Sequence, residues 1–133
     1  MKATFSGLSF YFILKGDYMG KGVTLKENRD FLRIYRKGKS FVGTSLVTYV
    51  LKNRSNEKRY GITTSKKIGN AVQRSRARRV IRASLFDLYS YIIPGYDIVF
   101  VSRGKTPYVK STLVKKEMIS HLEKANVLRK EQL

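Results

Sequence analysis

The hydrophobic pattern predicts three strands in the middle of the chain. Residues 41–51 are rich in β-branched and aromatic side chains, and residues 59–65 form a similar run after the polar turn 53–58. We expect these two runs to pair as antiparallel strands, because a short polar turn joins them. Farther along the chain, residues 96–102 are apolar on both faces, which is typical of a strand buried on both sides. In the first run, alternation predicts one face made of Phe41, Val47, Tyr49 and Leu51 and another made of Val42, Leu46 and Val50.

Helical periodicity predicts one helix before these strands and one after them. Thr24 and Glu27 form a capping box for the first helix, with Asn28 as the alternative cap, and Gly38 is placed to end it. Pro107 precedes the last helix. The side chains expected on its core side are Leu113, Met118, Leu122 and Ala125.

A further helix is predicted between the second and third strands. Asn70 is its expected N-cap, Gln73 can return the hydrogen bond as in a capping box, and the helix extends towards Tyr89. A step of about 100° per residue defines a core side. This side consists of Ala77, Val80, Ile81, Ser84, Leu85 and Leu88. The order helix, strand, strand, helix, strand, helix predicts an α+β fold, a two-layer sandwich in which helices cover one face of a small central sheet.

Length and composition indicate one domain. The chain has 133 residues, of which 42% are hydrophobic, and this is enough for a real core. We expect residues 23–133 to form a single domain and residues 1–22 to be an N-terminal extension, with Met19 as an alternative start. The apolar run 8–14 is too short to span a bilayer, so no membrane partner is expected.

The charge of the chain points to a polyanionic partner. The 28 Lys and Arg residues outnumber the 9 Asp and Glu residues, and the net charge is +19. Such a balance favours nucleic acid over a membrane or an acidic protein. The chain has no cysteine, which excludes disulfides and thiolate metal sites and fits a cytoplasmic protein.

The densest positive charge lies in residues 66–82, which read KKIGNAVQRSRARRVIR. The arginines of this segment fan across the side of the helix opposite its core side, and no acid occurs between Glu57 and Asp87. The alternative is an ordinary solvated face, but such faces usually place acids one turn away from the basic residues. The pattern therefore predicts a surface for a polyanion.

No catalytic or metal site is apparent from the sequence. The only histidine, His121, is expected to be a surface residue of the last helix, and the acids are scattered singly without metal-binding spacing. Phe31 and Tyr35 stand one helical turn apart, and the pattern alone favours a core position for both.

One stretch resembles a known family. Residues 59–82, RYGITTSKKIGNAVQRSRARRVIR, closely resemble the signature of the protein subunit of bacterial ribonuclease P. Residues 26–42 resemble the family's first helix and first strand, and residues 94–103 its later strand, so the resemblance covers residues 23–129. Ser75 departs from the pattern, because the family has asparagine between the two arginines.

The resemblance implies a ribonucleoprotein endonuclease that removes the 5′ leader from precursor tRNA. In that family the RNA subunit is the catalyst and holds the Mg²⁺ ions, and the protein does not cleave alone. The expected assembly is one protein monomer with one ribonuclease P RNA. The implied fold contains a left-handed strand-helix-strand crossover and is shared with a domain of a small-subunit ribosomal protein.

The resemblance also implies two sets of site residues. The set expected to bind the catalytic RNA is Lys66, Lys67, Asn70, Arg74, Ser75, Arg76, Arg78, Arg79 and Arg82. The set expected to line a cleft for the single-stranded leader is Phe31, Tyr35, Val47 and Tyr49. By this implication the two helical aromatics stack on unpaired bases, contrary to the core position that the pattern favours.

Three other functions stay open at this point. A structural RNA-binding protein of the ribosome would share the basic surface and the fold. A helix-based DNA reader would place the arginines in a major groove, usually as a dimer. A self-sufficient nuclease would need acids that converge in space.

Overall fold

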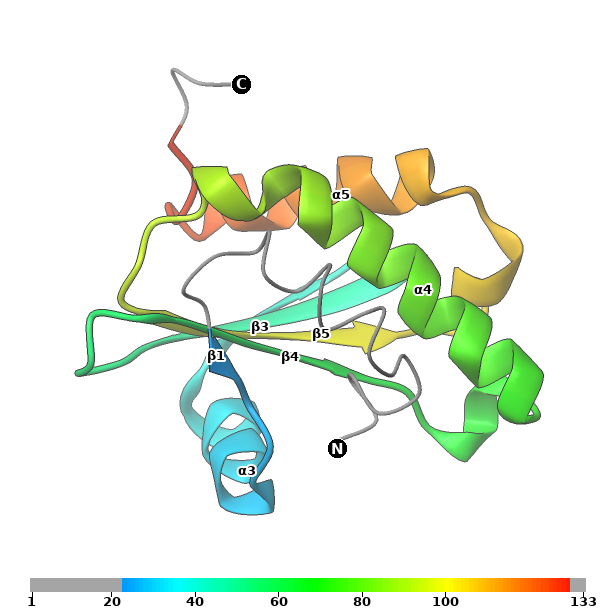
Figure 1. Ribbon diagram of the computed structural model, residues 1–133, viewed down its shortest axis with the longest axis horizontal. Coiled ribbons are helices and arrows are strands. Elements are labelled where there is room, and N and C mark those ends of the chain that lie inside the picture. The colour runs from blue at the N-terminus through cyan, green and yellow to red at the C-terminus, as the bar shows by residue number, and fades with distance from the viewer. Residues whose placement is uncertain (1–22, 130–133) are drawn as a thin grey trace.

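A five-stranded sheet organises residues 23–129, the part of the chain that the computed structural model describes (Figure 1). Its strands are β1 (Val23–Thr24), β2 (Lys39–Val42), β3 (Leu46–Lys52), β4 (Lys58–Thr63) and β5 (Tyr96–Ser102), and their order is β1-β4-β5-β3-β2. The predicted extension at residues 1–22 lies outside the described residues. The α+β class is confirmed, and the three predicted helices keep their predicted order relative to the strands, but the structure adds β1 and divides the first predicted strand into β2 and β3.

The apolar strand β5 lies at the centre of the sheet, as its two-sided pattern predicted. It pairs with β3 in an antiparallel register and with β4 in a parallel one. The predicted antiparallel hairpin between residues 41–51 and 59–65 is therefore wrong. The polar turn does not return the chain onto β3, because β5 occupies that position and a helix carries the chain from β4 across to β5.

The predicted long strand 41–51 is two strands. β2 and β3 pair in an antiparallel register and reverse direction at residues 43–45, where the Gly43 N–H donates to the Leu46 carbonyl at 2.8 Å. The reversal also changes the expected faces. Phe41 packs on the side of His121, with ring centroids 6.1 Å apart, while Val42 is exposed.

The helices cover both faces of the sheet. Helices α4 (Ala71–Leu88) and α5 (Ser111–Lys124) lie on one face, and α3 (Asn28–Lys37) lies on the other (Figure 1). Short 3-10 turns flank them at Lys66–Ile68, Tyr89–Tyr91 and Thr106–Tyr108. The expectation that helices cover a single face is therefore wrong, because a sheet whose central strand is apolar on both faces needs cover on both.

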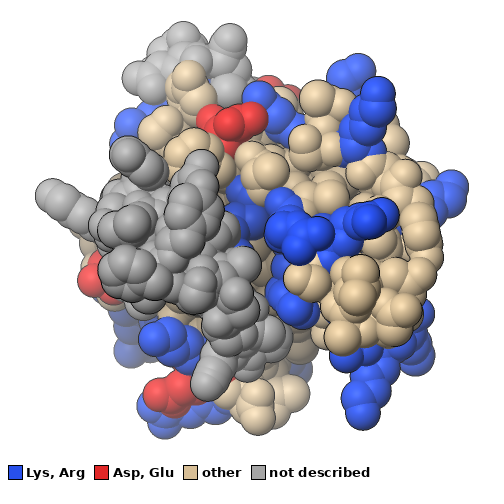
Figure 2. Space-filling view, turned by 45° about the vertical axis from the view of Figure 1, so that its right-hand side comes forward, with Lys and Arg blue, Asp and Glu red and all other residues tan. Residues whose placement is uncertain are grey.

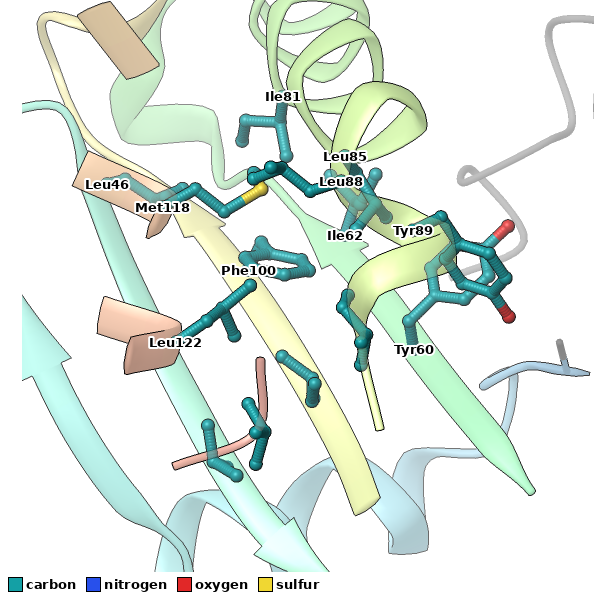
Figure 3. Close-up of a cluster of buried hydrophobic side chains, with 14 of the residues drawn as sticks. Leu46, Tyr60, Ile62, Ile81, Leu85, Leu88, Tyr89, Phe100, Met118 and Leu122 are labelled. Atoms are coloured by element: carbon teal, nitrogen blue, oxygen red, sulfur yellow. The ribbon is translucent and has the colours of Figure 1, made fainter. Parts of the chain in front are cut away.

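Two clusters of buried side chains match these two faces. The larger one joins α4 and α5 to the sheet and includes Leu46, Ile62, Ile81, Leu85, Phe100, Met118 and Leu122 (Figure 3). The smaller one joins α3 to the sheet through Leu25, Phe31, Ile34 and Val99. Helix α3 is thus held on the sheet by few apolar contacts, and α4 by many.

Two predictions about the first and last helices need correction. Glu27 is the N-cap of α3 and makes no side-chain capping bond, while Thr24 belongs to β1, so the predicted capping box is absent. Gly38 does end the helix, and its N–H donates to the Ile34 carbonyl at 2.8 Å. In α5, Leu113 is exposed and Val114 takes its place in the core.

Candidate nucleic-acid interface

The basic helix begins with the cap that the sequence predicts. The Asn70 side chain accepts from the Gln73 N–H at 2.9 Å, and the Gln73 side chain accepts from the Asn70 N–H at 2.9 Å. Just before this cap, Gly69 has a φ of 143°, a conformation that favours glycine. Its carbonyl accepts from the Arg74 guanidinium at 2.7 Å. The Gly-Asn pair therefore fixes the first turn of α4 and one of its arginines.

Four arginines of α4 lie outside the core and have no acidic partner in the described part of the chain. Arg76 and Arg79 are exposed, and Arg74 and Arg78 are half-buried. None of the four forms an ion pair with an acid among residues 23–129. Arg78 donates to the Thr64 hydroxyl at 3.2 Å, and Arg79 reaches the Ser75 hydroxyl at 3.4 Å. Neutral oxygen atoms orient these guanidinium groups without cancelling their charge.

Burial and neighbouring charges both act on one of these arginines, Arg78. Burial lowers the pKa of Arg78 below its ordinary value, and the neighbouring charges of Arg74 and Arg79 lower it further. Like charges one turn apart on a helix repel one another. A bound polyanion would relieve this repulsion, so the face is electrostatically suited to phosphate groups.

The surrounding surface has the same character. The face that comes forward in Figure 2 carries many Lys and Arg side chains and few acids. Beside α4, a hollow of about 490 Å³ lies between Arg76, Arg79 and the start of α5 at Lys110 and Ser111. At the beginning of the helix, the Gln73 amide donates to the hydroxyl of Tyr108, whose ring is exposed. Tyr108 was not among the predicted site residues, and its only signal in the sequence is an aromatic residue in the short segment between Lys105 and Lys110.

Arg82 differs from the other arginines of the predicted set. Its side chain is buried, with 3% of its surface exposed. Burial lowers the pKa of Arg82 to about 10, an effect that nearby Tyr60 partly offsets. The structure therefore sets Arg82 apart from the exposed arginines. The other predicted residues lie nearer the surface. Lys66 and Lys67 are exposed in the 3-10 turn before α4, and Ser75 is half-buried in α4 itself.

The predicted leader residues are brought together on the α3 face, but they are not equivalent. Tyr35 is 38% exposed and meets Tyr49 edge to face, with ring centroids 4.9 Å apart. Val47 and Tyr49 are half-buried on the same face of β3. Phe31 is only 5% exposed and belongs to the smaller core cluster. Tyr35, Tyr49 and Val47 therefore present surface, whereas Phe31 supports them from below.

His121 lies in the core rather than on the surface. It is 5% exposed, its Nδ1 atom is 2.8 Å from the Thr48 hydroxyl, and its ring stacks on Phe41. The prediction of a surface histidine is wrong, because β2 brings the ring of Phe41 over this turn of α5. Between residues 23 and 129, no group of three or more His, Asp or Glu side chains is placed to hold a metal ion. No helix in this range is long and apolar enough to cross a membrane.

Fold and surface together define a class: a small α+β protein with a basic helix on which Arg74, Arg76, Arg78 and Arg79 have no carboxylate partner within residues 23–129, which suits this face to a polyanion. Comparison with known proteins narrows this class. The family model for ribonuclease P matches residues 19–126. The ribonuclease P protein component of Clostridium beijerinckii is 40% identical over 116 residues, which cover 82% of this chain and 93% of that protein. The component of Listeria monocytogenes serotype 4b is 40% identical over 112 residues, covering 84% and 94%.

Solved structures agree with this match. The RNase P protein of Staphylococcus aureus shares 33% identity, with a TM-score of 0.71 over 82% of this chain and 100% of that one. The RNase P protein of Thermotoga maritima shares 30% identity, with a TM-score of 0.67 over 76% and 96%. The chain belongs to the family of ribonuclease P protein components.

Proposed function

We propose that this chain is the protein subunit of a ribonucleoprotein that removes the 5′ leader from precursor tRNA in the cytoplasm. The observation that carries the proposal is the face of α4, where Arg74, Arg76, Arg78 and Arg79 have no carboxylate partner among residues 23–129. For a member of the ribonuclease P family, the polyanion that fits this face is the ribonuclease P RNA. Arginine forks pair well with phosphate oxygens, and each such contact strengthens binding.

The proposal also includes a contact between the protein and the single-stranded 5′ leader. Unpaired bases of a single strand can stack on aromatic rings with a gain of ~1 to 3 kcal/mol per base and little sequence preference. Tyr35 and Tyr49 offer partly exposed rings for this, with Val47 beside them. Because mature tRNA has no leader, this contact slows dissociation of the substrate and leaves dissociation of the product unchanged.

The protein contributes binding rather than a covalent step. The RNA subunit is the catalyst in this proposal and the main holder of Mg²⁺, which supplies a metal-activated hydroxide and stabilises the departing 3′ oxygen. The arginines of α4 neutralise phosphates that are packed closely in the folded RNA. Screening of these phosphates also lowers the cost of folding the RNA around its metal sites, so the protein raises both substrate and Mg²⁺ affinity.

Cleavage assays test the proposal directly. A 5′-extended precursor tRNA is incubated at near-physiological Mg²⁺ with the protein alone, with a bacterial ribonuclease P RNA alone, and with both. We expect cleavage at the mature 5′ end only, or much faster, in the mixture of both. Cleavage by RNA-free protein would show that the protein carries its own active site. Absence of any effect of the protein would favour a structural RNA-binding role in the ribosome.

A charge variant tests the assignment to α4. Arg76→Gln removes an exposed guanidinium that has no partner within residues 23–129. The plot of log binding constant against log salt for the ribonuclease P RNA should lose ~0.7 to 0.9 of its slope per lost phosphate contact. Lys124→Gln, an exposed residue at the end of α5, is the matched control and should keep the slope. An unchanged slope for Arg76→Gln would remove this residue from the interface.

A further inference from the structure

A second basic hollow lies on the face of the sheet opposite α4. It is about 460 Å³ in volume, within the range of about 300 to 1,000 Å³ that is common for ligand sites. Five cationic side chains line it together with the amide of Asn53: Arg33, Lys37, Lys52, Arg54 and Arg59. We refer to this hollow as the β3–β4 pocket, because the loop between these strands forms one of its walls.

The loop that forms this wall is held by its own hydrogen bonds. The Asn53 side-chain oxygen accepts from the backbone N–H groups of Ser55 and Asn56, at 3.0 and 3.2 Å. The Asn53 amide nitrogen donates to the Glu57 carbonyl at 3.1 Å and to Asp97 at 2.9 Å. The wall is therefore built before any ligand arrives, and a ligand does not have to order it.

A buried carboxylate fixes the two arginines on the floor of the pocket. Asp97 is fully buried, and its oxygens lie 2.7 Å from Arg33 and 3.4 Å from Arg59. Asp30 adds contacts to the same two arginines, at 3.6 and 3.3 Å. The two carboxylates thus neutralise the charges of Arg33 and Arg59 and hold these two side chains in place.

The other three cations of the pocket have no carboxylate partner in the part of the chain that the structure describes. Lys37, Lys52 and Arg54 form no ion pair among residues 23–129, and Lys52 and Arg54 are exposed at the rim. Glu57, the acid of the same loop, does not line the pocket. The pocket therefore has an excess of positive charge, no acidic residue in its lining, and a preformed wall.

We infer that the β3–β4 pocket binds a phosphate group of an RNA backbone, at a place separate from both α4 and the rings of Tyr35 and Tyr49. The anionic oxygens of a phosphodiester can accept hydrogen bonds from the cationic side chains that line the pocket. Because the loop is already ordered, binding loses little free energy to the ordering of this loop. The inference rests on the proposed function, because that function makes RNA the ligand. Since α3 and α4 lie on opposite faces of the sheet, this contact would let RNA hold the protein from both sides (Figure 1).

A pair of double variants tests the inference in the full-length protein. Lys52→Gln/Arg54→Gln removes two exposed rim charges, and Lys116→Gln/Lys124→Gln removes two exposed charges from α5. Both lower the net charge equally, so a general effect of charge is the same in both. Thermal unfolding is measured first, and both variants should melt like the parent, because all four side chains are exposed.

Salt-dependent binding then distinguishes the sources of the phosphate. For the ribonuclease P RNA alone, the rim variant should lose ~0.7 to 0.9 of slope for each contact removed, and the α5 variant should not. If the loss appears instead only when the holoenzyme binds precursor tRNA and not mature tRNA, the phosphate belongs to the leader. Equal behaviour of the two variants in both assays would overturn the inference. Arg76→Gln, measured alongside, shows separately whether the α4 assignment holds.

Discussion

Replacement of Phe31 and of Tyr35 by alanine separates core packing from leader binding, although the two rings stand one turn apart on α3. Phe31 is 5% exposed, and its ring lies against the backbone of β4, where a Cβ on Gly61 would be only 2.7 Å from Phe31 Cε1. Removal of a buried phenyl ring costs ~3 to 5 kcal/mol. Since α3 has a small core cluster, we expect Phe31→Ala to lower the melting temperature by more than about 10 °C.

Tyr35→Ala should behave in the opposite way. The ring is 38% exposed, and its folded contacts are an edge-to-face pair with Tyr49 and a 3.4 Å hydrogen bond to Thr63 at the surface. An aromatic pair of this kind contributes ~0.5 to 1.5 kcal/mol, so the loss of stability should be small. A stacked base is worth ~1 to 3 kcal/mol, which predicts about 5-fold to 150-fold weaker binding of precursor tRNA.

The assay compares precursor and mature tRNA on the reconstituted holoenzyme, alongside thermal unfolding of each variant. Tyr35→Phe keeps the ring and removes the hydroxyl, so it should bind precursor like the parent. The reasoning is refuted for Tyr35 if alanine weakens precursor and mature tRNA equally. It is refuted for Phe31 if the alanine variant melts like the parent and yet loses precursor binding selectively.

Two further predictions concern α5. Glu117 accepts hydrogen bonds from the Thr44 hydroxyl at 2.6 Å and from the Ser45 N–H at 3.1 Å. Glu117→Ala should therefore destabilise the protein at the β2–β3 hairpin by ~1 to 3 kcal/mol, measured by denaturant unfolding at pH 7. Unchanged stability would contradict this role. Burial lowers the pKa of His121 below its ordinary 6.5, so the unfolded chain takes up the proton first, and the free energy of unfolding should fall as the pH drops below about 6.5. His121→Gln should flatten this fall between pH 7 and 5, and an equally steep fall in the variant would count against it.

Local signals account for the parts of the fold that the sequence predicted. The capping box at Asn70 depends on residues three positions apart, and the central place of β5 follows from its own two-sided apolar pattern. The basic face of α4 likewise follows from helical periodicity and the absence of acids between Glu57 and Asp87. Each of these features depends only on residues within one helix or strand, so it can be predicted without knowledge of the tertiary structure.

Three of the wrong predictions share a different cause. The split of residues 41–51 into two strands depends on Glu117, which holds the turn from more than 70 positions away. The burial of His121 depends on Phe41 and Thr48, which come from β2 and β3. The parallel place of β4 depends on the path of α4 over the sheet. Contacts between distant segments decided each case, and no periodicity within one segment carries them.

The acids of the chain offer a criterion for separating structural arginines from those available to RNA. Arg33 and Arg59 share the buried Asp97 with the loop amide of Asn53, so their charge ties α3, β4 and β5 together. Arg76 and Arg79 have no carboxylate partner among residues 23–129 and lie exposed. The chain has 28 basic and only 9 acidic residues, and a carboxylate that is paired inside the fold cannot neutralise a surface arginine. Within residues 23–129, acids lie beside Arg33 and Arg59, which support α3, and not beside Arg76 and Arg79, so the outward charge of α4 stays unneutralised where a phosphate backbone is expected to lie.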